Sequence, residues 1–392
     1  MKVLFTCQPA LGHLHPLIPL GQALTDAGHE VAFACAPAFC STVKQQSFHC
    51  FPAGLDWLVS EAENSFPKMK NMSLMEQSRW FLTYVFANVT ARAMLRDLLT
   101  TARRWSPDLI VRDCWEFGGY VAAEKLNIPH ASAGLGTFFS LQALREFIGP
   151  QLKYLRRIAG LPLDPELETL YRYLYIHFAP PSYLPSQDTV PVAHAFRLSL
   201  FDRTGNEQLP AWIENLSDFP TVYGTLGTVV NKVPGIFESI LNALQDEPVN
   251  LVLTIGRDQD PAQFGPRPSN VYIERYIPQT LLLPHCDVVI SHGGYNTFMA
   301  ALSHGLPQLV IPLGADQLFH AQKCTALNVG ITLSGEQANP QAIKDAVRTL
   351  LENSMYLENA NRIKEEILAM PGPEQAVELL EQLTIENRPI FR

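Results

Sequence analysis

The sequence predicts an α/β fold built from two doubly wound domains. Short apolar runs of strand length alternate with stretches whose apolar residues recur at helical spacing, and this alternation begins a second time near residue 221. The expected strands lie at 2–7, 30–36, 108–111, 130–132, 221–226, 250–255, 271–276, 287–291 and 308–313. Because helical stretches connect the strands, neighbouring strands should run parallel.

Glycine and proline mark the ends of several expected helices. These helices lie at 16–27, 118–126, 235–244 and 295–304. Gly28 and Gly305 follow two of them, at the position of a left-handed C-terminal cap that glycine adopts without steric cost. Pro371 and Pro373 must interrupt a further helix that begins near Leu357, because proline cannot continue it.

The expected domains follow from this pattern. Residues 1–205 form the first domain, residues 216–373 form the second, and the helix within 374–392 packs back on the first domain. The polar and poorly periodic stretch from Asp202 to Ser217 is the expected linker.

Composition narrows the class of protein. Hydrophobic residues make up 47% of the 392 residues and charged residues 17%, which excludes a disordered chain. The net charge of −9 and the lack of a basic, aromatic-rich run argue against a nucleic-acid partner. We find no signal peptide and no apolar run of about 20 residues, so we expect a cytoplasmic protein without stable membrane insertion.

The seven cysteines are an odd set without a C-x-x-C motif, and most lie in apolar runs. This pattern indicates buried, reduced thiols. No group of cysteine, histidine and carboxylate residues has the spacing of metal ligands, so no metal is expected.

Two segments of the first domain, 55–100 and 134–190, do not follow the alternation and are expected to be helical or looped. Both are rich in aromatic residues. Aromatic side chains at helical spacing usually belong to the core, but two aromatic insertions beside one sheet edge would roof an apolar cleft.

The strongest local signal is the segment 291–297, Ser-His-Gly-Gly-Tyr-Asn-Thr, between an expected strand and helix. A helix N-terminus presents free backbone N–H groups and a favourable dipole to a phosphate, and glycine allows close approach. His292 would add a charge-assisted hydrogen bond. An ordinary capped helix start would show the same residues, and the dinucleotide fingerprint G-x-G-x-x-G is absent.

The surrounding residues identify this segment further. Arg-Tyr-Ile-Pro-Gln at 275–279 precedes it, and Pro-Leu-Gly-Ala-Asp-Gln at 312–317 follows it. In order and spacing, this block resembles the donor-binding signature of nucleotide-sugar-dependent glycosyltransferases of the GT-B fold, in which two Rossmann-like domains face each other across a cleft. The resemblance covers nearly the whole chain and is closest to bacterial enzymes that glycosylate macrolides, polyketides and related natural products.

The resemblance implies a role for each matching donor-site residue. Tyr276 would stack on or flank the nucleobase and the Ile277 backbone would pair with the base edge, with Gln279 beside them. Asp316 and Gln317 would hydrogen-bond the sugar hydroxyls. The positions facing the diphosphate would be Gly227, Thr228, His292, Gly293, Gly294, Asn296 and Thr297.

In the first domain, Gly-His-Leu-His-Pro at 12–16 lies at the first strand-to-helix turn. The family pattern G-H-x-x-P makes His13 the general base, with His15 as the competing histidine. Asp113, after the strand at 108–111, matches the acidic partner that orients the base, and Glu116 is its competitor. Aromatic residues expected to contact the acceptor are Trp57, Phe81, Phe138 and Phe139.

The resemblance therefore implies an inverting glycosyltransferase that uses neither metal nor cofactor, with a nucleotide diphosphate sugar as co-substrate and an apolar small molecule as acceptor. The protein would act as a monomer or homodimer. Ala300 stands where plant relatives carry a glutamate that accepts hydrogen bonds from both ribose hydroxyls, so a thymidine diphosphate (TDP) sugar should be accepted. The alternatives are a catalytically silent helper of a partner transferase, a sugar-nucleotide epimerase and, less favoured, a nicotinamide oxidoreductase.

Overall fold

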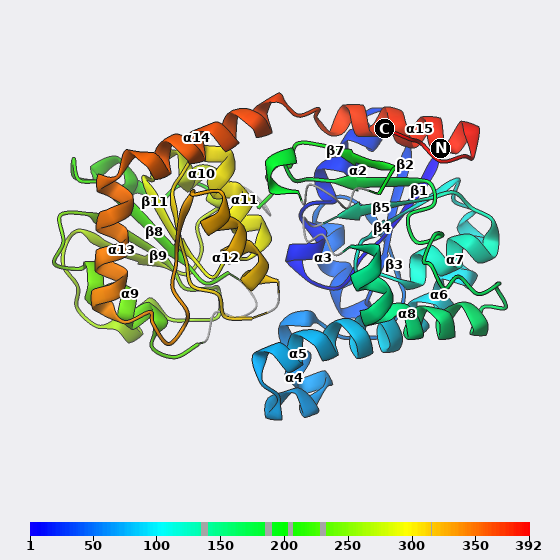
Figure 1. The fold of residues 1–392 in the computed structure, drawn as a ribbon, viewed down its shortest axis with the longest axis horizontal. Helices are drawn as coiled ribbons and strands as arrows, with labels where there is room; N and C mark the ends of the chain where they lie inside the picture. The colour runs from blue at the N-terminus through cyan, green and yellow to red at the C-terminus, as the bar shows by residue number, and fades with distance from the viewer. Residues whose placement is uncertain (135–139, 185–189, 203–206, 228–232, 315) are drawn as a thin grey trace. The chain divides into compact units, whose positions relative to one another are not determined.

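The computed structural model describes residues 1–134, 140–184, 190–202, 207–227, 233–314 and 316–392. The chain divides into two compact units, which are drawn in Figure 1. Unit 1 comprises Met1–Phe201 and Met370–Arg392, and unit 2 comprises Asp202–Ala369. Each unit is an α/β domain with its own parallel sheet.

Unit 1 contains a sheet whose strands are all parallel to their neighbours. Within the described residues its seven strands follow the order β3-β2-β1-β4-β5-β6-β7. The strands are β1 Lys2–Thr6, β2 Glu30–Cys35, β3 His49–Pro52, β4 Leu109–Asp113, β5 His130–Gly134, β6 Leu174–His177 and β7 Ala193–Ala195. The order reverses between β1 and β4, and doubly wound sheets bind ligands at the carboxyl ends of the strands at such a point.

Helices cover this sheet, as buried parallel strands require. The helices described in unit 1 are α1 Leu11–Leu14, α2 Ile18–Asp26, α3 Cys40–Gln45, α4 Ala62–Ser65, α5 Leu74–Trp80, α6 Ala91–Trp105, α7 Gly118–Leu126, α8 Leu141–Ile158 and α15 Pro373–Glu386. A π-helical segment, Phe81–Thr90, joins α5 to α6.

The final helix belongs to unit 1. Helix α15 packs along α2, and Figure 1 shows it beside the first strands of the chain. His29 contacts Glu381 through a 2.8 Å Nε2–Oε1 hydrogen bond, and the Thr384 hydroxyl lies 3.3 Å from the Met1 sulfur. Residues 370–392 are therefore an integral part of unit 1.

Unit 2 repeats the architecture with six parallel strands in the described chain, in the order β10-β9-β8-β11-β12-β13. They are β8 Thr221–Thr225, β9 Asn250–Thr254, β10 Val271–Glu274, β11 Val288–Ser291, β12 Gln308–Val310 and β13 Gly330–Thr332. The helices are α9 Ile236–Leu244, α10 Gln279–Leu282, α11 Tyr295–His304, α12 Gln317–Ala326, α13 Pro340–Glu352 and α14 Ser354–Ala369. The strand order reverses between β8 and β11.

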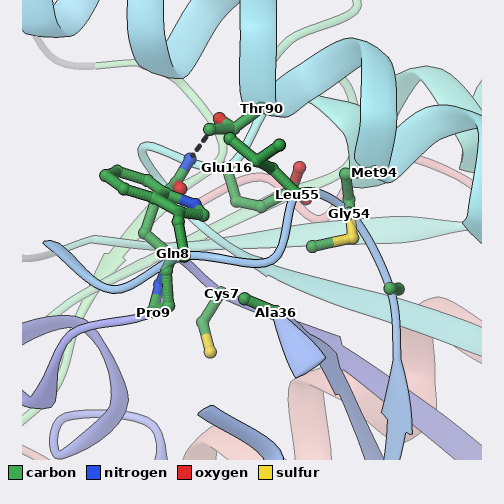
Figure 2. A pocket seen from close by; sticks show the side chains of 11 residues that line it. Cys7, Gln8, Pro9, Ala36, Gly54, Leu55, Thr90, Met94 and Glu116 are labelled. Atoms are coloured by element: carbon green, nitrogen blue, oxygen red, sulfur yellow. Dashed lines mark hydrogen bonds between the residues drawn. The ribbon is translucent and has the colours of Figure 1, made fainter. Parts of the chain in front are cut away.

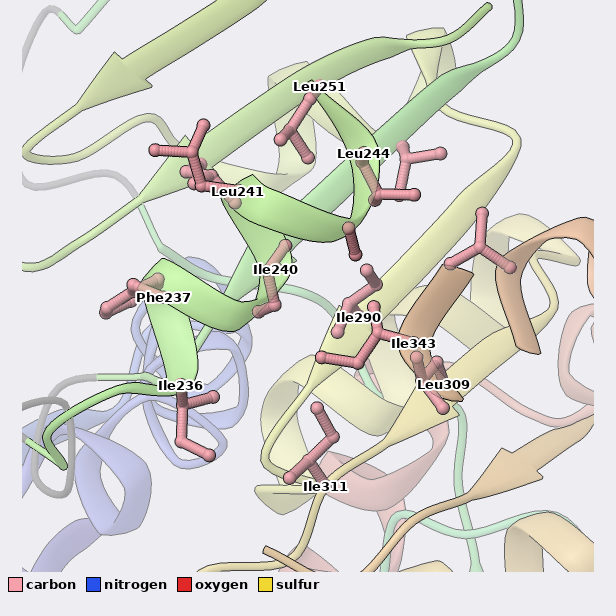
Figure 3. Close-up of a cluster of buried hydrophobic side chains, with 14 of the residues drawn as sticks. Ile236, Phe237, Ile240, Leu241, Leu244, Leu251, Ile290, Leu309, Ile311 and Ile343 are labelled. Atoms are coloured by element: carbon pink, nitrogen blue, oxygen red, sulfur yellow. The ribbon is translucent and has the colours of Figure 1, made fainter. Parts of the chain in front are cut away.

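The core of unit 2 lies between this sheet and helices α9 and α13. Ile240 and Ile343, from the two helices, meet Ile290 and Leu309 of β11 and β12 in one apolar cluster, shown in Figure 3. All four side chains are fully buried. This packing fixes the sheet and with it the carboxyl ends of the strands.

The polar stretch 202–217 was expected to be a linker, and its described residues, Asp202 and 207–217, group with unit 2. The Asp202 carboxylate accepts hydrogen bonds from the backbone N–H and the hydroxyl of Thr280, at 3.0 and 2.7 Å. Trp212 stacks on Tyr272 with ring centroids 4.2 Å apart. These contacts attach Asp202 and Trp212 to unit 2, although the sequence around them carries no periodic signal.

The segment 134–190 was expected to be helical or looped, and this expectation is wrong for Leu174–His177, which form β6. Tyr175 of this strand is 4% exposed and pairs in register with Ser132 of β5. Four residues are too few to show a period, so pairing with β5 decides the conformation. No helix of the described residues has the length and apolar character needed to cross a membrane.

Candidate active site

His13 and Asp113 meet at the point in unit 1 where the strand order reverses. His13 lies in α1, directly after β1, and Asp113 is the last residue of β4, the parallel neighbour of β1. The two side chains form a 2.7 Å hydrogen bond between His13 Nδ1 and Asp113 Oδ2. The His13 side chain is 15% exposed, whereas Asp113 is fully buried. A buried carboxylate thus orients a histidine that keeps contact with solvent.

Backbone groups hold the Asp113 carboxylate in place. The Gln8 N–H donates to Oδ2 at 3.3 Å, and the Trp115 N–H donates to Oδ1 at 3.1 Å. These donors compensate for the water that a buried carboxylate loses. The orientation of the His13 ring is therefore determined by three chain segments: the end of β1, the α1 turn and the end of β4.

Glu116, the competing acidic residue, is engaged elsewhere. Its two carboxylate oxygens accept from the Thr6 hydroxyl at 2.6 Å and from the Gly118 and Gly119 N–H groups at 2.6 and 2.7 Å. Burial raises the pKa of this carboxyl group. Glu116 thus caps the start of α7, and the structure brings Asp113 to His13.

Arg112 is a buried residue of this site that the sequence did not reveal. Its side chain is fully buried, and Nη1 donates to the carbonyls of Asp113, Cys114 and Glu116 at 3.2, 2.9 and 3.2 Å. The guanidinium group fixes the turn that follows Asp113. A lone arginine inside a strand carries no signal for this arrangement.

His15, the competing histidine, lies at the C-terminal end of α1. Its ring packs edge-on against Phe201, with centroids 5.7 Å apart. His15 therefore packs against Phe201, the last residue of the segment Met1–Phe201, whereas His13 is the histidine that contacts Asp113.

The first aromatic insertion forms a connected cluster that reaches His13. Trp57 is 4% exposed and contacts Phe81 and Phe86, with centroids 5.8 and 6.3 Å apart. Phe86 meets the His13 ring edge-on at 5.8 Å, and sequence reasoning missed this contact. The other expected acceptor residues, Phe138 and Phe139, lie outside the described residues.

Trp57 of this cluster also lines a small pocket. Its lining includes Cys7, Gln8, Trp57 and Thr90, and Figure 2 shows Gln8 hydrogen-bonded to Thr90. The pocket has room for about one water molecule. It is too small to hold an apolar acceptor.

In unit 2, the glycine-rich turn follows β11 at the point where the strand order reverses. Gly293 has φ +78°, and a Cβ atom there would lie 2.7 Å from Val310 Cγ1. At Gly227 and Gly294 a Cβ atom would lie 2.6 and 2.4 Å from atoms of the His292 ring. Glycine is therefore required at all three positions. Thr228 lies outside the described residues.

His292 supports this turn by packing its ring against Gly227 and Gly294. Its ring is partly buried, and burial lowers its pKa to about 4. The histidine is therefore neutral near pH 7. Burial disfavours the imidazolium form that the expected charge-assisted hydrogen bond to a diphosphate would require.

The acid stability of the protein should depend on His292. The folded-state pKa of about 4 lies below the value of about 6.5 in an unfolded chain, so the unfolded state binds more protons between these values. The stability contributed by neutral His292 is present above pH 6.5 or so and is lost as pH falls towards 4. Between pH 7 and pH 5, the wild type should lose about 2 kcal/mol more unfolding free energy than His292→Gln.

Urea denaturation at the two pH values measures this difference. The control is His285→Gln, which replaces an exposed histidine of the same unit and should follow the wild type. Equal acid losses in wild type and His292→Gln would contradict the prediction.

Helix α11 begins directly after the glycine-rich turn. Its N-cap is Gly294, which has no side chain to cap the first backbone N–H groups. In the first turn, the Thr297 hydroxyl accepts a 3.0 Å hydrogen bond from Gln279 Nε2, and Asn296 lies beside it. Gln279 also lies 3.4 Å from the Tyr223 hydroxyl. The structure thus brings two expected donor-site segments together at a helix N-terminus suited to a phosphate.

Tyr276 and Ile277 follow β10. The Tyr276 hydroxyl donates to the Asp202 carbonyl, and the Arg257 guanidinium lies 3.9 Å from its ring centroid. Burial raises the pKa of Tyr276. One face of the ring is thus covered by Arg257, so a nucleobase that stacks on Tyr276 would use the other face or displace the arginine. Ile277 is 2% exposed.

Asp316 and Gln317 begin helix α12, after β12. The Asp316 carboxylate is 38% exposed and lies 3.1 Å from His320 Nε2. Gln317 is 4% exposed, and its Oε1 accepts from the Leu313 N–H at 2.7 Å. The Gln317 side chain thus holds Leu313 of the preceding loop through its amide oxygen.

Among the described residues, the group of side chains that could hold a metal ion is Cys35, Cys40 and Cys50, all buried in unit 1. The spacing of these cysteines gave no indication of the cluster. The cysteine cluster belongs to unit 1, whereas the glycine-rich turn belongs to unit 2.

Comparisons with known proteins agree with this architecture. Residues 22–227 match the N-terminal domain, and residues 238–383 the C-terminal domain, of the family described as erythromycin biosynthesis protein CIII-like. The chain is 30% identical to the aclacinomycin-T 2-deoxy-L-fucose transferase of Streptomyces galilaeus, over 99% of this chain and 97% of that protein.

Two further proteins extend the comparison. The TDP-daunosamine transferase DnrS of Streptomyces peucetius is 27% identical over 99% of this chain and 98% of its own. The crystal structure of the glycosyltransferase SnogD from Streptomyces nogalater matches with a TM-score of 0.77 and 26% identity, covering 98% of this chain and 99% of that chain. The two Rossmann-like units of this chain, which match a solved glycosyltransferase structure, constitute the GT-B fold.

These matches set aside the epimerase and oxidoreductase alternatives, because both halves of the chain match one family of sugar transferases. With its GT-B fold, the chain belongs to the erythromycin biosynthesis protein CIII-like family and is a natural-product glycosyltransferase.

Proposed function

We propose that this glycosyltransferase inverts the anomeric centre while it transfers a sugar from a TDP-sugar to a hydroxyl group of an apolar acceptor, with His13 as general base. The observation that carries the proposal is the 2.7 Å hydrogen bond between His13 Nδ1 and buried Asp113. An ionised carboxylate accepts the Nδ1 proton, so the neutral ring presents the lone pair of Nε2 to a ligand.

The chemistry follows from this tautomer. Nε2 accepts the proton of the acceptor hydroxyl while its oxygen attacks the anomeric carbon from the face opposite the departing nucleotide diphosphate. A single displacement inverts that centre. The imidazolium that forms is stabilised by the Asp113 carboxylate 2.7 Å away, as in other base–orienter pairs.

On the donor side, the leaving diphosphate gains negative charge as the bond breaks. The N-terminus of α11, which follows N-cap Gly294, would offer backbone N–H groups and the positive end of a helix dipole, with Thr297 in the same turn. Asp316 and the amide nitrogen of Gln317 would bind the sugar hydroxyls. His292 would support the turn by packing against Gly227 and Gly294.

The acceptor would lie against the aromatic cluster that includes Trp57, Phe81 and Phe86. Phe86 supports this assignment because it contacts the His13 ring, so an apolar surface continues up to the proposed base. One relative is named as an aclacinomycin-T 2-deoxy-L-fucose transferase, which supports a natural-product acceptor.

Release of TDP in the presence of polycyclic and macrocyclic alcohols tests the proposed activity. With an α-linked donor, the anomeric configuration of the product, read from its proton coupling constant by nuclear magnetic resonance, should be β. Retention of configuration would refute the mechanism, and no transfer to any acceptor would favour a silent helper protein.

The enzyme should accept a sugar donor that carries a thymidine nucleotide. Ala300 of α11 is 2% exposed and has no group that could accept a hydrogen bond from a ribose 2′-hydroxyl, and one relative is named for its TDP-sugar. We expect kcat/KM for TDP-glucose to be at least comparable to that for UDP-glucose. Preference for UDP-glucose by more than about a hundredfold, roughly 2.7 kcal/mol, would contradict this. In Ala300→Glu the ratio should move towards UDP-glucose, with Tm measured to verify folding.

Excess chelator is expected to leave the transfer rate unchanged. The N-terminal amides of α11 would stabilise the diphosphate where other transferases place a cation. The measurement compares initial rates with and without EDTA after prolonged incubation. Complete inactivation that magnesium or manganese reverses would contradict the metal-free mechanism.

A further inference from the structure

Three cysteine thiols from separate elements of unit 1 meet in one buried cluster. Cys35 ends β2, Cys40 begins α3 and Cys50 lies in β3. Their sulfur atoms all lie within 4.8 Å of one another. Parallel pairing of β2 with β3 places Cys35 and Cys50 near each other, and the short helix between these strands brings Cys40 to them.

Cys40 and Cys50 form the closest pair. The Cys50 thiol donates to Cys40 Sγ over 2.8 Å, whereas Cys35 Sγ lies 3.4 Å from Cys50 Sγ. A small movement of either side chain would bring Cys40 and Cys50 within bonding distance. Cys35 is more deeply buried than either of them, with no exposed surface.

The surroundings of the sulfurs suit neutral groups better than a metal–thiolate centre. The backbone atoms hydrogen-bonded to the three sulfurs in the described chain are the carbonyls of Cys35, Ala36 and Phe51, at 4.0, 3.7 and 3.8 Å. Carbonyl oxygens accept from S–H groups but repel thiolates. A metal ion would require deprotonated ligands. A dithiol or a disulfide satisfies the site without a buried net charge.

Of the close pair, Cys40 is the better nucleophile. It is 7% exposed, and its pKa is lowered by the neighbouring Cys35 and Cys50 thiols and by the charge of Lys44, with burial and Asp56 opposing. The hydrogen bond with the Cys35 thiol, followed by burial, raises the pKa of Cys50. The hydrogen bond that the Cys50 thiol donates to Cys40 Sγ over 2.8 Å would stabilise a thiolate at Cys40, and the neutral Cys50 thiol lies beside it.

We propose that Cys40 and Cys50 form a peroxide-oxidisable dithiol. The Cys40 thiolate attacks hydrogen peroxide, the O–O bond breaks, and Cys40 sulfenic acid forms; the released hydroxide takes up the proton that Cys40 lost and becomes water. Cys50 sulfur then attacks Cys40 sulfur, and the S–O bond breaks. The second hydroxide takes up the Cys50 proton. Two thiols and one peroxide thus give one disulfide and two waters, and two electrons pass from sulfur to oxygen.

Thiol counting with mass mapping tests this proposal on the full chain. The native protein is treated with hydrogen peroxide, quenched, unfolded in acid and alkylated. The sequence has seven cysteines, and we expect two fewer alkylation sites after oxidation, with a 2 Da loss mapped to a Cys40–Cys50 peptide pair. Dithiothreitol should restore all seven. The same treatment of urea-unfolded protein should give mixed pairs.

Matched serine variants assign the two roles. Cys40→Ser and Cys50→Ser should each lose the 2 Da change, and Cys50→Ser should leave a sulfenic acid at Cys40 that dimedone traps. Cys35→Ser is the control and should still form the Cys40–Cys50 bond. No loss of thiols in the wild type, an equal loss in Cys40→Ser, or stoichiometric zinc that protects all three thiols would overturn the proposal.

Discussion

Replacement of His13 by alanine is expected to lower the rate of sugar transfer by about two to four orders of magnitude. A correctly placed general base contributes about this much to a reaction in which an alcohol is the nucleophile. The affinity for TDP should hardly change, because the residues expected to bind the diphosphate belong to unit 2. Single-turnover rates and calorimetric titration with TDP measure the two quantities separately.

His15→Ala is the matched control for this variant. His15 lies two residues away on the same turn but packs against Phe201, so its replacement should leave the transfer rate within a few-fold of wild type. A fully active His13→Ala, or an inactive His15→Ala with normal folding, would show that the base is assigned wrongly.

Asp113→Asn should lower the transfer rate by about three to four orders of magnitude. An asparagine amide donates to His13 Nδ1 where the carboxylate accepts, which turns the ring to the tautomer that carries its proton on Nε2 and removes the base. Because the tautomer and not the charge of the ring is wrong, raising the pH should not restore the rate.

Glu116→Gln distinguishes the two acidic residues. An amide cannot accept from Thr6, Gly118 and Gly119 as the carboxylate does, so one buried N–H loses its partner and stability should fall by about 1–3 kcal/mol. The rate per folded molecule should stay near wild type. A severe loss of rate in Glu116→Gln, together with an active Asp113→Asn, would exchange the roles of these residues.

The sequence predicted the parts of the site whose positions follow from the order of the strands and from the turns after them. His13 and Asp113 follow two strands that lie side by side at the reversal of strand order, so a parallel sheet must bring them together. The glycine-rich turn was predictable for the same reason. Glycine itself is also informative there, because a larger residue at Gly227 or Gly294 would collide with the His292 ring.

Other features depend on contacts that a linear pattern does not encode. Arg112 binds carbonyls of the turn that follows its own strand, and in the sequence it is one charged residue in an apolar run. Phe86 reaches His13 because of the π-helical segment between α5 and α6, which has no periodic signature of its own. The neutral state of His292 follows from burial and could not be deduced from its motif.

The return of α15 to unit 1 has a consequence for the order in which the protein folds on the ribosome. Unit 2 is a single continuous stretch, Asp202–Ala369, inserted between the two segments of unit 1. It can complete its core while synthesis continues. Unit 1 must wait, because Val377, Leu380 and Leu383 of α15 supply buried side chains at the face where it packs along α2. Until that helix emerges, the apolar face of α2 remains open to solvent and to any chaperone that binds nascent chains.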